Sequence, residues 1–263
     1  MESYRNNLRL RWTPKQTLVV LKAIQRQRQY RYWTQVLRLI RRDVPVPKDL
    51  RYIDLSGRQL ASIELKELDL FGAKLLKTNL RNAILQESKF VKCILQEADL
   101  CHAEMERADF SASNLKKIAL QSVIAHEVIL SEAKLLDANI RKARMPKATA
   151  ISADFTRADL TRVNLRGSVC NLSRFKYAEM YRADLSGANL MECDFSRANL
   201  TRANLRGANL RKADLRDAVL VGADLRHADL SETKRKGANF YGVIMTKEDR
   251  RRYIESHPNL NRS

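Results

Sequence analysis

Histidine and cysteine, the residue types most often found in metal and catalytic centres, are few and scattered in this chain. The four histidines have neither a second histidine nor a cysteine at metal-ligand spacing: His102, His126, His227 and His257. We expect Cys93, Cys170 and Cys193 to face inward as small apolar side chains and only Cys101 to face solvent. The chain also lacks a C-x-x-C pair, a phosphate-binding glycine loop and a nucleophile elbow. We therefore expect no enzyme activity, no cofactor or metal, and no small-molecule substrate.

Regularly spaced aspartates are the next residues that could act as catalytic acid pairs. Each of them directly precedes an apolar residue: Asp99, Asp109, Asp159, Asp184, Asp214 and Asp224. Aspartate oxygens in turns commonly accept hydrogen bonds from nearby backbone N–H groups. The favoured interpretation is therefore a structural repeat consensus in which the carboxylates stabilise turns.

Positive side chains recur at intervals of twenty residues and could bind an anion. One series consists of Lys142, Arg162, Arg182 and Arg202, and a second contains Arg157 and Arg197. If twenty residues make one coil, each series forms a row with charges about 5 Å apart, which repel by about 1 kcal/mol per pair in water. A polyanion lying along the row would relieve that repulsion. The alternative is a solvated face that Asp159, Glu179 and Asp184 neutralise.

Positive charge is also concentrated near the N-terminus. The chain carries 49 Lys and Arg against 30 Asp and Glu, a net charge of +19. Residues 1–50 contribute twelve of the basic and only three of the acidic side chains, so they supply nearly half of the net charge. The cluster includes Arg26, Arg28, Arg31, Arg38, Arg41 and Arg42. Such a charge informs about partners rather than fold, and the cluster is either a second anion-binding segment or the solvated face of a cap.

A five-residue period positions all of these residues. From Leu55 to Met245 a large apolar side chain occupies nearly every fifth position, and a small one, such as Ala98 or Ala153, stands two residues before it. Helices repeat at 3.6 residues and strands at 2, so neither explains this pattern. A short fixed period is typical of a solenoid.

Glycine and phenylalanine predict the shape of the solenoid. We call the large apolar position of each five-residue unit its central position. All eight glycines stand two residues after such a position, which indicates one recurring corner with unusual backbone angles. Phe155, Phe175 and Phe195 are twenty residues apart, as are Phe90 and Phe110. Four five-residue units therefore make one coil, and the rings stack inside it.

The pattern A-(D/N)-L-x-x resembles the repeat of the pentapeptide-repeat family. ADLSG at 183–187 and ANLRK at 208–212 are well-formed units, and the resemblance covers about 51–245. It implies an all-β solenoid, a right-handed four-sided β-helix of about ten coils with short helical caps at both ends. At about 4.8 Å per coil the rod would be roughly 45–50 Å long.

Three regions follow along the chain. We expect a basic, mainly helical N-terminal cap over 1–50, the β-helix over 51–245, and a short C-terminal helix and tail over 246–263. Thr246 followed by Asp249 is typical of a helix start. The resemblance implies that this last segment can form a homodimer. Arg235 occupies a central position and predicts a distorted last coil.

Three functions remain open. The first is a non-enzymatic scaffold that binds an anionic partner, either nucleic acid, an acidic protein or a phospholipid surface, through its basic rows and the arginine-rich N-terminal segment. The resemblance implies the second, because some family members mimic DNA, bind type II topoisomerases and confer quinolone resistance. Mimicry needs a negative surface, whereas 51–245 holds 32 basic and 24 acidic residues. Glu67, Glu87 and Glu127 leave an acidic remnant on one side.

The third function is a regulatory protein that binds a protein partner through its N-terminal coils. There isoleucine replaces the usual Asp or Asn before the centre, which predicts a less regular and more apolar surface: Ile84, Ile94, Ile124 and Ile129. No apolar stretch is long enough to span a bilayer, and the segment 18–24 is too short for a secretory core. Inward-facing cysteines without a disulfide framework are typical of the cytoplasm, where we expect the protein.

Overall fold

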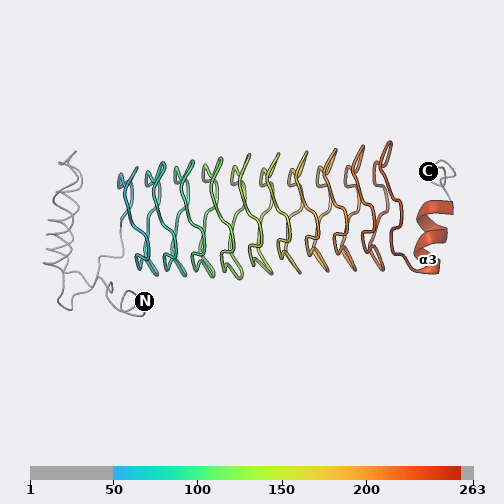
Figure 1. Cartoon of the computed structure of the whole chain (residues 1–263), viewed down its shortest axis with the longest axis horizontal. Coiled ribbons are helices and arrows are strands. Elements are labelled where there is room, and N and C mark those ends of the chain that lie inside the picture. Colours follow the sequence, from blue (N-terminus) through green and yellow to red (C-terminus); the bar gives the residue numbers. More distant parts are fainter. Residues whose placement is uncertain (1–49, 256–263) are drawn as a thin grey trace, which may run out of the picture.

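The computed structural model describes residues 50–255, which form a straight rod of stacked coils with a helix at its C-terminal end (Figure 1). The N-terminal cap expected over 1–50, with its arginines from Arg26 to Arg42, lies outside the described residues apart from Leu50. The helical elements are α3 (Lys247–Arg250) and the π-helical turn η2 (Arg251–Glu255). Between 50 and 245 the chain builds only the rod.

Each coil is twenty residues long and has four sides. Every β-bridge is parallel and joins residues twenty apart, from Asp54 with Lys74 to Asp224 with Ile244. Each side contributes a single bridging residue, whose N–H donates to the previous coil, while the N–H of the following central residue donates to the next coil. Lys74 N, for example, lies 2.8 Å from Ile53 O, and Leu75 N lies 2.7 Å from Ile94 O. The four-sided solenoid of about ten coils is therefore confirmed.

Every corner is a β-turn with the same unusual backbone conformation. In a representative turn Ala98 N donates to Leu95 O at 3.0 Å. The residue two positions after each centre has a positive φ, whether it is one of the eight glycines or one of thirty-one other residues. That conformation costs a non-glycine residue about 1–2 kcal/mol. The corner N–H offsets part of this cost by donating to the next coil, as Arg162 N does to Tyr181 O at 2.9 Å.

The interior is filled by the central residues and the small residues two positions before them. Nearly all of them are fully buried. The predicted phenylalanine stacks are confirmed, since the centroids of Phe155 and Phe175 are 4.8 Å apart, those of Phe175 and Phe195 4.9 Å, and those of Phe90 and Phe110 4.7 Å. These separations match the distance between neighbouring strands, so the rings stack one coil apart, in one column of three and a separate column of two.

The regularly spaced aspartates stabilise corners, as their structural interpretation predicts. Asp184 Oδ1 accepts a hydrogen bond of 3.0 Å from the backbone N–H of Ser186, two residues later. The same bond is made by all six aspartates of the series: Asp99, Asp109, Asp159, Asp184, Asp214 and Asp224. An oxygen of each carboxylate is therefore committed to the backbone.

The prediction that Cys101 faces solvent is wrong. Its side chain is buried, and its thiol donates to Gln121 Oε1, 2.5 Å away. Cys101 lies at a corner position that normally faces outward, but the glutamine of the next coil covers it. Burial raises the pKa of Cys101 to about 11 and that of Cys93 to about 12.

The last coil is regular, contrary to the distortion expected from Arg235. Lys234 N still donates to Ala213 O at 3.0 Å, and Asn239 still bridges Val219. Arg235 is tolerated at a central position because no coil follows it, so its Nη1 donates to Tyr253 O in η2, 2.8 Å away. Thr246 caps α3, and Asp249 Oδ2 accepts a hydrogen bond of 2.9 Å from the backbone N–H of His227. The predicted C-terminal helix start is thus confirmed, and α3 and η2 cover this end of the rod.

The N-terminal coils are also as regular as the others, so the expected irregularity is wrong. Bridges run without interruption from Asp54 onwards. The four isoleucines do lie outside the core, but on three different sides of the rod. Ile84 and Ile124 share one side, while Ile94 and Ile129 each lie on another. They do not form one apolar surface.

Replacing the central ring of the phenylalanine column tests the packing. We expect Phe175→Ala to lower the free energy of unfolding by about 3–5 kcal/mol, because it removes a fully buried ring and leaves a cavity between two others. The control, Leu172→Ala, alters a nearby side chain that is 51% exposed and should change stability by less than about 1 kcal/mol. Urea unfolding followed by circular dichroism measures both, and equal effects would contradict the stacked core.

The buried thiols give a second test. At pH 8 we expect all four cysteines of the native protein to react with a disulfide reagent at least about 100-fold more slowly than in urea, because burial keeps them protonated. Release of the coloured thiolate of the reagent counts them. One fast equivalent in the native protein would show that Cys101 is accessible after all.

Candidate functional site: a basic side of the rod

The row predicted from Lys142, Arg162, Arg182 and Arg202 exists. The four residues occupy one corner in successive coils, next to the bridges of Arg144 with Asn164 and of Asp184 with Asn204. Their φ values of 55–60° belong to the left-handed corner conformation, and all four side chains are exposed. They form a straight line of cations along one edge of the rod, spaced by the coil repeat of about 4.8 Å.

This row is not neutralised by its neighbours. Over residues 50–255, none of its four cations forms an ion pair. Arg182 stacks on the ring of Tyr181, with 5.3 Å between guanidinium carbon and ring centroid, and Arg202 Nη1 lies 3.5 Å from the Tyr181 hydroxyl. The acids expected to neutralise the row have other partners: Asp159 pairs with Arg141, Glu179 accepts from Asn199, and Asp184 accepts from Ser186 and Asn204.

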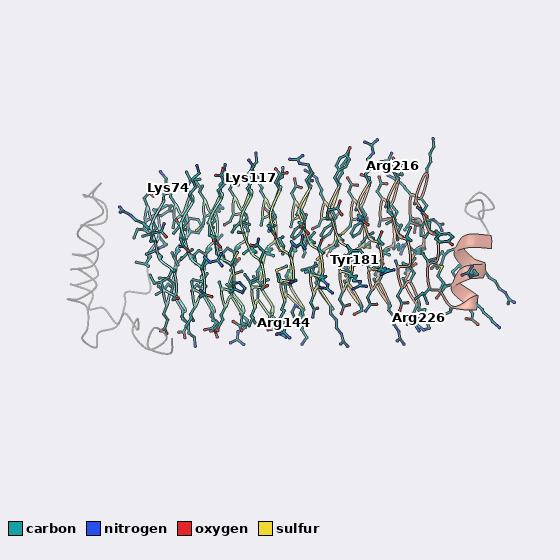
Figure 2. All side chains as sticks on the ribbon, viewed as in Figure 1. Lys74, Lys117, Arg144, Tyr181, Arg216 and Arg226 are labelled. Atoms are coloured by element: carbon teal, nitrogen blue, oxygen red, sulfur yellow. The ribbon has the colours of Figure 1, made fainter. Side chains whose placement is uncertain are left out.

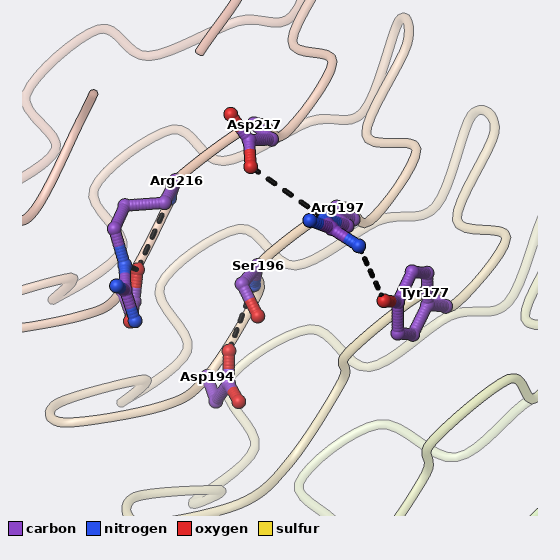
Figure 3. Close-up of polar contacts among 7 residues, drawn as sticks. Tyr177, Asp194, Ser196, Arg197, Arg216 and Asp217 are labelled. Atoms are coloured by element: carbon purple, nitrogen blue, oxygen red, sulfur yellow. Dashed lines mark hydrogen bonds and ion pairs between the residues drawn. The ribbon is translucent and has the colours of Figure 1, made fainter. Parts of the chain in front are cut away.

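The second predicted row differs, because both of its arginines are paired. Arg157 makes two hydrogen bonds to Asp137, of 2.7 and 3.0 Å, which lower the pKa of that carboxyl group. Arg197 lies between the Tyr177 hydroxyl, 2.7 Å away, and Asp217, 3.5 Å away (Figure 3). Along this corner Tyr177 separates the two arginines and an aspartate flanks each of them, so Arg157 and Arg197 have their positive charges balanced within the protein.

Three further arginines on the side next to the unpaired row escaped the sequence analysis. Arg144, Arg166 and Arg206 are exposed and form no ion pair within the described part of the chain. Arg144 lies on the same edge of the rod as Arg226 (Figure 2), which is paired with Asp224. The sequence does indicate them, since Arg166 and Arg206 share one position of the twenty-residue frame. They are recognised only when the charges of a whole side of the rod, rather than of a single row, are counted together.

We call the surface formed by the outward residues of 142–147, 162–167, 182–187, 202–207 and 222–227 the basic side. It carries nine cations and two carboxylates, Asp184 and Asp224. Both carboxylates are committed, Asp184 to Ser186 and Asn204, and Asp224 to Arg226, whose guanidinium lowers the pKa of Asp224. One edge of the side is a corner of three stacked glycines, Gly167, Gly187 and Gly207. The arrangement suits contact with an extended anionic surface.

Residues 50–255 contain no cluster of metal-ligating side chains and no helix that could span a membrane. Nowhere between 50 and 255 do three His, Cys, Asp or Glu side chains gather as metal ligands would. Neither α3 nor η2 has the length and apolar composition that crossing a bilayer requires. The exposed groups of the basic side are mainly guanidinium and ammonium cations, which offer charge and hydrogen bonding.

Comparisons with known proteins agree with the repeat. The family model for pentapeptide repeats matches in eight copies, over residues 63–100, 85–116, 129–167, 153–190, 178–217 and 208–246. No curated protein matches the chain. Among solved structures, HetL from the cyanobacterium Nostoc sp. strain PCC 7120, a pentapeptide repeat protein involved in heterocyst differentiation regulation, is 30% identical. The match covers 76% of this chain and 90% of HetL, with a TM-score of 0.53.

A second structure extends the comparison of the fold. It is a trypsin-treated variant of QnrB1, a plasmid-mediated fluoroquinolone resistance protein, and it is 18% identical over 74% of this chain and 97% of its own, with a TM-score of 0.64. At this identity the likeness concerns the fold alone.

Proposed function

Because the chain belongs to the pentapeptide-repeat family, with its right-handed four-sided β-helix, we propose that it is a non-enzymatic interaction scaffold whose basic side binds an anionic partner. Nucleic acid and an acidic protein surface are the two partners that this chemistry fits. Family members generally act by binding rather than by catalysis. The arginine cluster of the N-terminal segment, from Arg26 to Arg42, would add contacts to the same partner.

The observation that carries this proposal is the unpaired row of Lys142, Arg162, Arg182 and Arg202. Elsewhere many exposed cations of the rod pair with an acid one coil away, as Arg107 does with Glu87 and Arg174 with Asp154. Such exposed pairs contribute only about 0–1 kcal/mol each, so the fold does not require them. Four adjacent unpaired cations repel one another, and an external polyanion would convert this repulsion into binding energy.

The proposal places the protein in the cytoplasm, as a regulator that acts through its partner. HetL, which is 30% identical, is described as involved in the regulation of differentiation. A regulatory role requires no active site, and the rod over 50–245 concentrates positive charge on its basic side.

The two other functions have weaker support. DNA mimicry needs a predominantly negative rod, whereas 51–245 carries more basic than acidic residues, and Glu87 and Glu127 pair with Arg107 and Lys147. The resemblance to QnrB1 concerns the fold alone. Docking through the outward isoleucines is disfavoured because these side chains lie on three sides of the rod.

Binding of a labelled DNA duplex and a labelled single-stranded RNA to the full-length protein, followed by fluorescence anisotropy from 50 to 200 mM salt, tests the proposal. We expect Arg162→Gln/Arg182→Gln/Arg202→Gln to weaken nucleic acid binding about 10- to 100-fold at 100 mM salt. The slope of log K against log salt should fall by about 3 for the duplex, because each lost phosphate contact removes about 0.9.

The matched control is Arg157→Gln/Arg174→Gln/Arg197→Gln, which removes three cations that are already paired. We expect it to change the slope by less than about 1. Equal effects of the two triple variants would overturn the role of the basic side. If neither nucleic acid binds at 50 mM salt, the partner is not a nucleic acid, and an acidic protein remains.

A further inference from the structure

The basic side is one half of a side that runs the whole length of the rod. Its other half consists of the outward residues of 62–67, 82–87, 102–107 and 122–127. That half carries two cations, Lys66 and Arg107, and six carboxylates: Glu64, Glu67, Glu87, Glu104, Glu106 and Glu127. The net charge is therefore −4 on the N-terminal half and +7 on the C-terminal half. When each of the other three sides is divided at the same point along the rod, the net charge of each half is at most three of either sign.

The acidic half is suited to being covered. Ile84 and Ile124 lie between its glutamates, and Ile124 is 38% exposed. Glu104 accepts a hydrogen bond from Gln86, and Arg107 pairs with Glu87, so these side chains are held along the surface. Glu106 Oε2 is buried without a hydrogen-bond partner in the described structure. This oxygen therefore has hydrogen-bonding capacity that the described residues leave unused.

We infer that this side binds a second copy of the chain in antiparallel orientation. A two-fold axis that runs across the side between 122–127 and 142–147 places the acidic half of each copy opposite the basic half of the other, with Glu127 opposite Lys147. Residues 122–127 then face 142–147, and 102–107 face 162–167, where Glu106 meets Arg166. Because the rod is straight and all coils share one spacing, this register holds along the whole side (Figure 1). The interface uses the same surface of both copies, as two-fold dimers do.

Such a dimer would be reversible. Eight coils at about 4.8 Å and a width of at most about 14 Å give at most roughly 540 Å² per copy, so the total of about 1,000 Å² falls at the lower limit of specific interfaces. The net charge of +19 opposes association at long range, but at 0.15 M salt it is screened beyond about 8 Å. The inference goes beyond the proposed function, because the second copy covers Lys142, Arg162, Arg182 and Arg202 and thus competes with an anionic partner.

Distances between spin labels test the orientation. Ser62 and Ser122 occupy the same corner, three coils apart, and the native cysteines are buried. In full-length protein at 0.15 M salt, the label on Ser122→Cys should lie within about 20 Å of its counterpart, because only one coil separates the two positions across the axis. The labels on Ser62→Cys should be about 34 Å apart, seven coils along the rod. Short distances for both labels would indicate parallel copies. Long distances for both labels would indicate association through the C-terminal segment, and the absence of any measurable distance would indicate that the copies do not associate. Each of these results would overturn the inference.

Charge reversal tests the complementarity independently. By sedimentation at about 100 μM, we expect the wild type to dimerise and Glu87→Lys/Glu104→Lys/Glu127→Lys and Arg162→Glu/Arg182→Glu/Arg202→Glu each to be monomeric. Mixing the two variants should restore dimers. The control Lys89→Glu/Lys117→Glu/Lys134→Glu reverses exposed lysines on other sides and should dimerise like the wild type.

Circular dichroism verifies that each variant is folded. A monomeric wild type, or control reversals that abolish dimers as the others do, would overturn the inference. Loss of nucleic acid binding would not, because dimerisation is measured without any nucleic acid. The two proposals therefore fail separately.

Discussion

The register between coils is the constraint on which the rest of this structure depends. Every bridge joins residues twenty apart, so the backbone of each coil forms hydrogen bonds with the coils before and after it. A register slip of one residue in any coil would turn central leucines outward and bury charged side chains, as in any sheet with one buried face. Because the register holds from Asp54 to Ile244, a residue's place in the twenty-residue frame determines which residues it stacks on and which side of the rod it occupies.

The corner conformation separates the surface from the core. At each corner the residue with positive φ points its side chain away from the interior, and glycine, lysine, arginine, glutamate and serine are all found there. The hydrogen bond between coils is made by the backbone, so the fold is compatible with many side chains at these positions. A basic row such as Lys142 to Arg202 can therefore exist at little cost to the core, and the same scaffold can carry different surfaces.

Much of the fold could be predicted from the sequence, because the five-residue period reports burial directly. The glycine phase indicated the corner, and the spacing of Phe155, Phe175 and Phe195 indicated four sides. The errors concern contacts between side chains of neighbouring coils. Cys101 is buried because Gln121 covers it, and Arg235 is accommodated because Tyr253 accepts its hydrogen bond. Such contacts depend on rotamers and on what lies beyond the last coil, which a periodic pattern does not contain. For the same reason the row membership of Arg157 could be predicted, but not its pairing with Asp137.

Charge on this rod is best understood as a set of rows, in which each side chain has neighbours one coil above and below. Where the neighbours have opposite signs, as for Arg157 and Asp137, the row neutralises itself and contributes little to binding. Where they share a sign, neutralisation must come from outside the row. One side of the rod gathers carboxylates in its N-terminal coils and mostly unpaired cations in its C-terminal coils. Apart from Glu127 and Lys147, which pair at the boundary, a single rigid rod cannot bring these complementary groups together. Only a separate molecule reaches them, either an anionic partner on the basic half or a second rod on both halves. Because both occupy the same cations, binding of one excludes the other, and the balance between them depends on the concentration of the protein as well as on that of its partner.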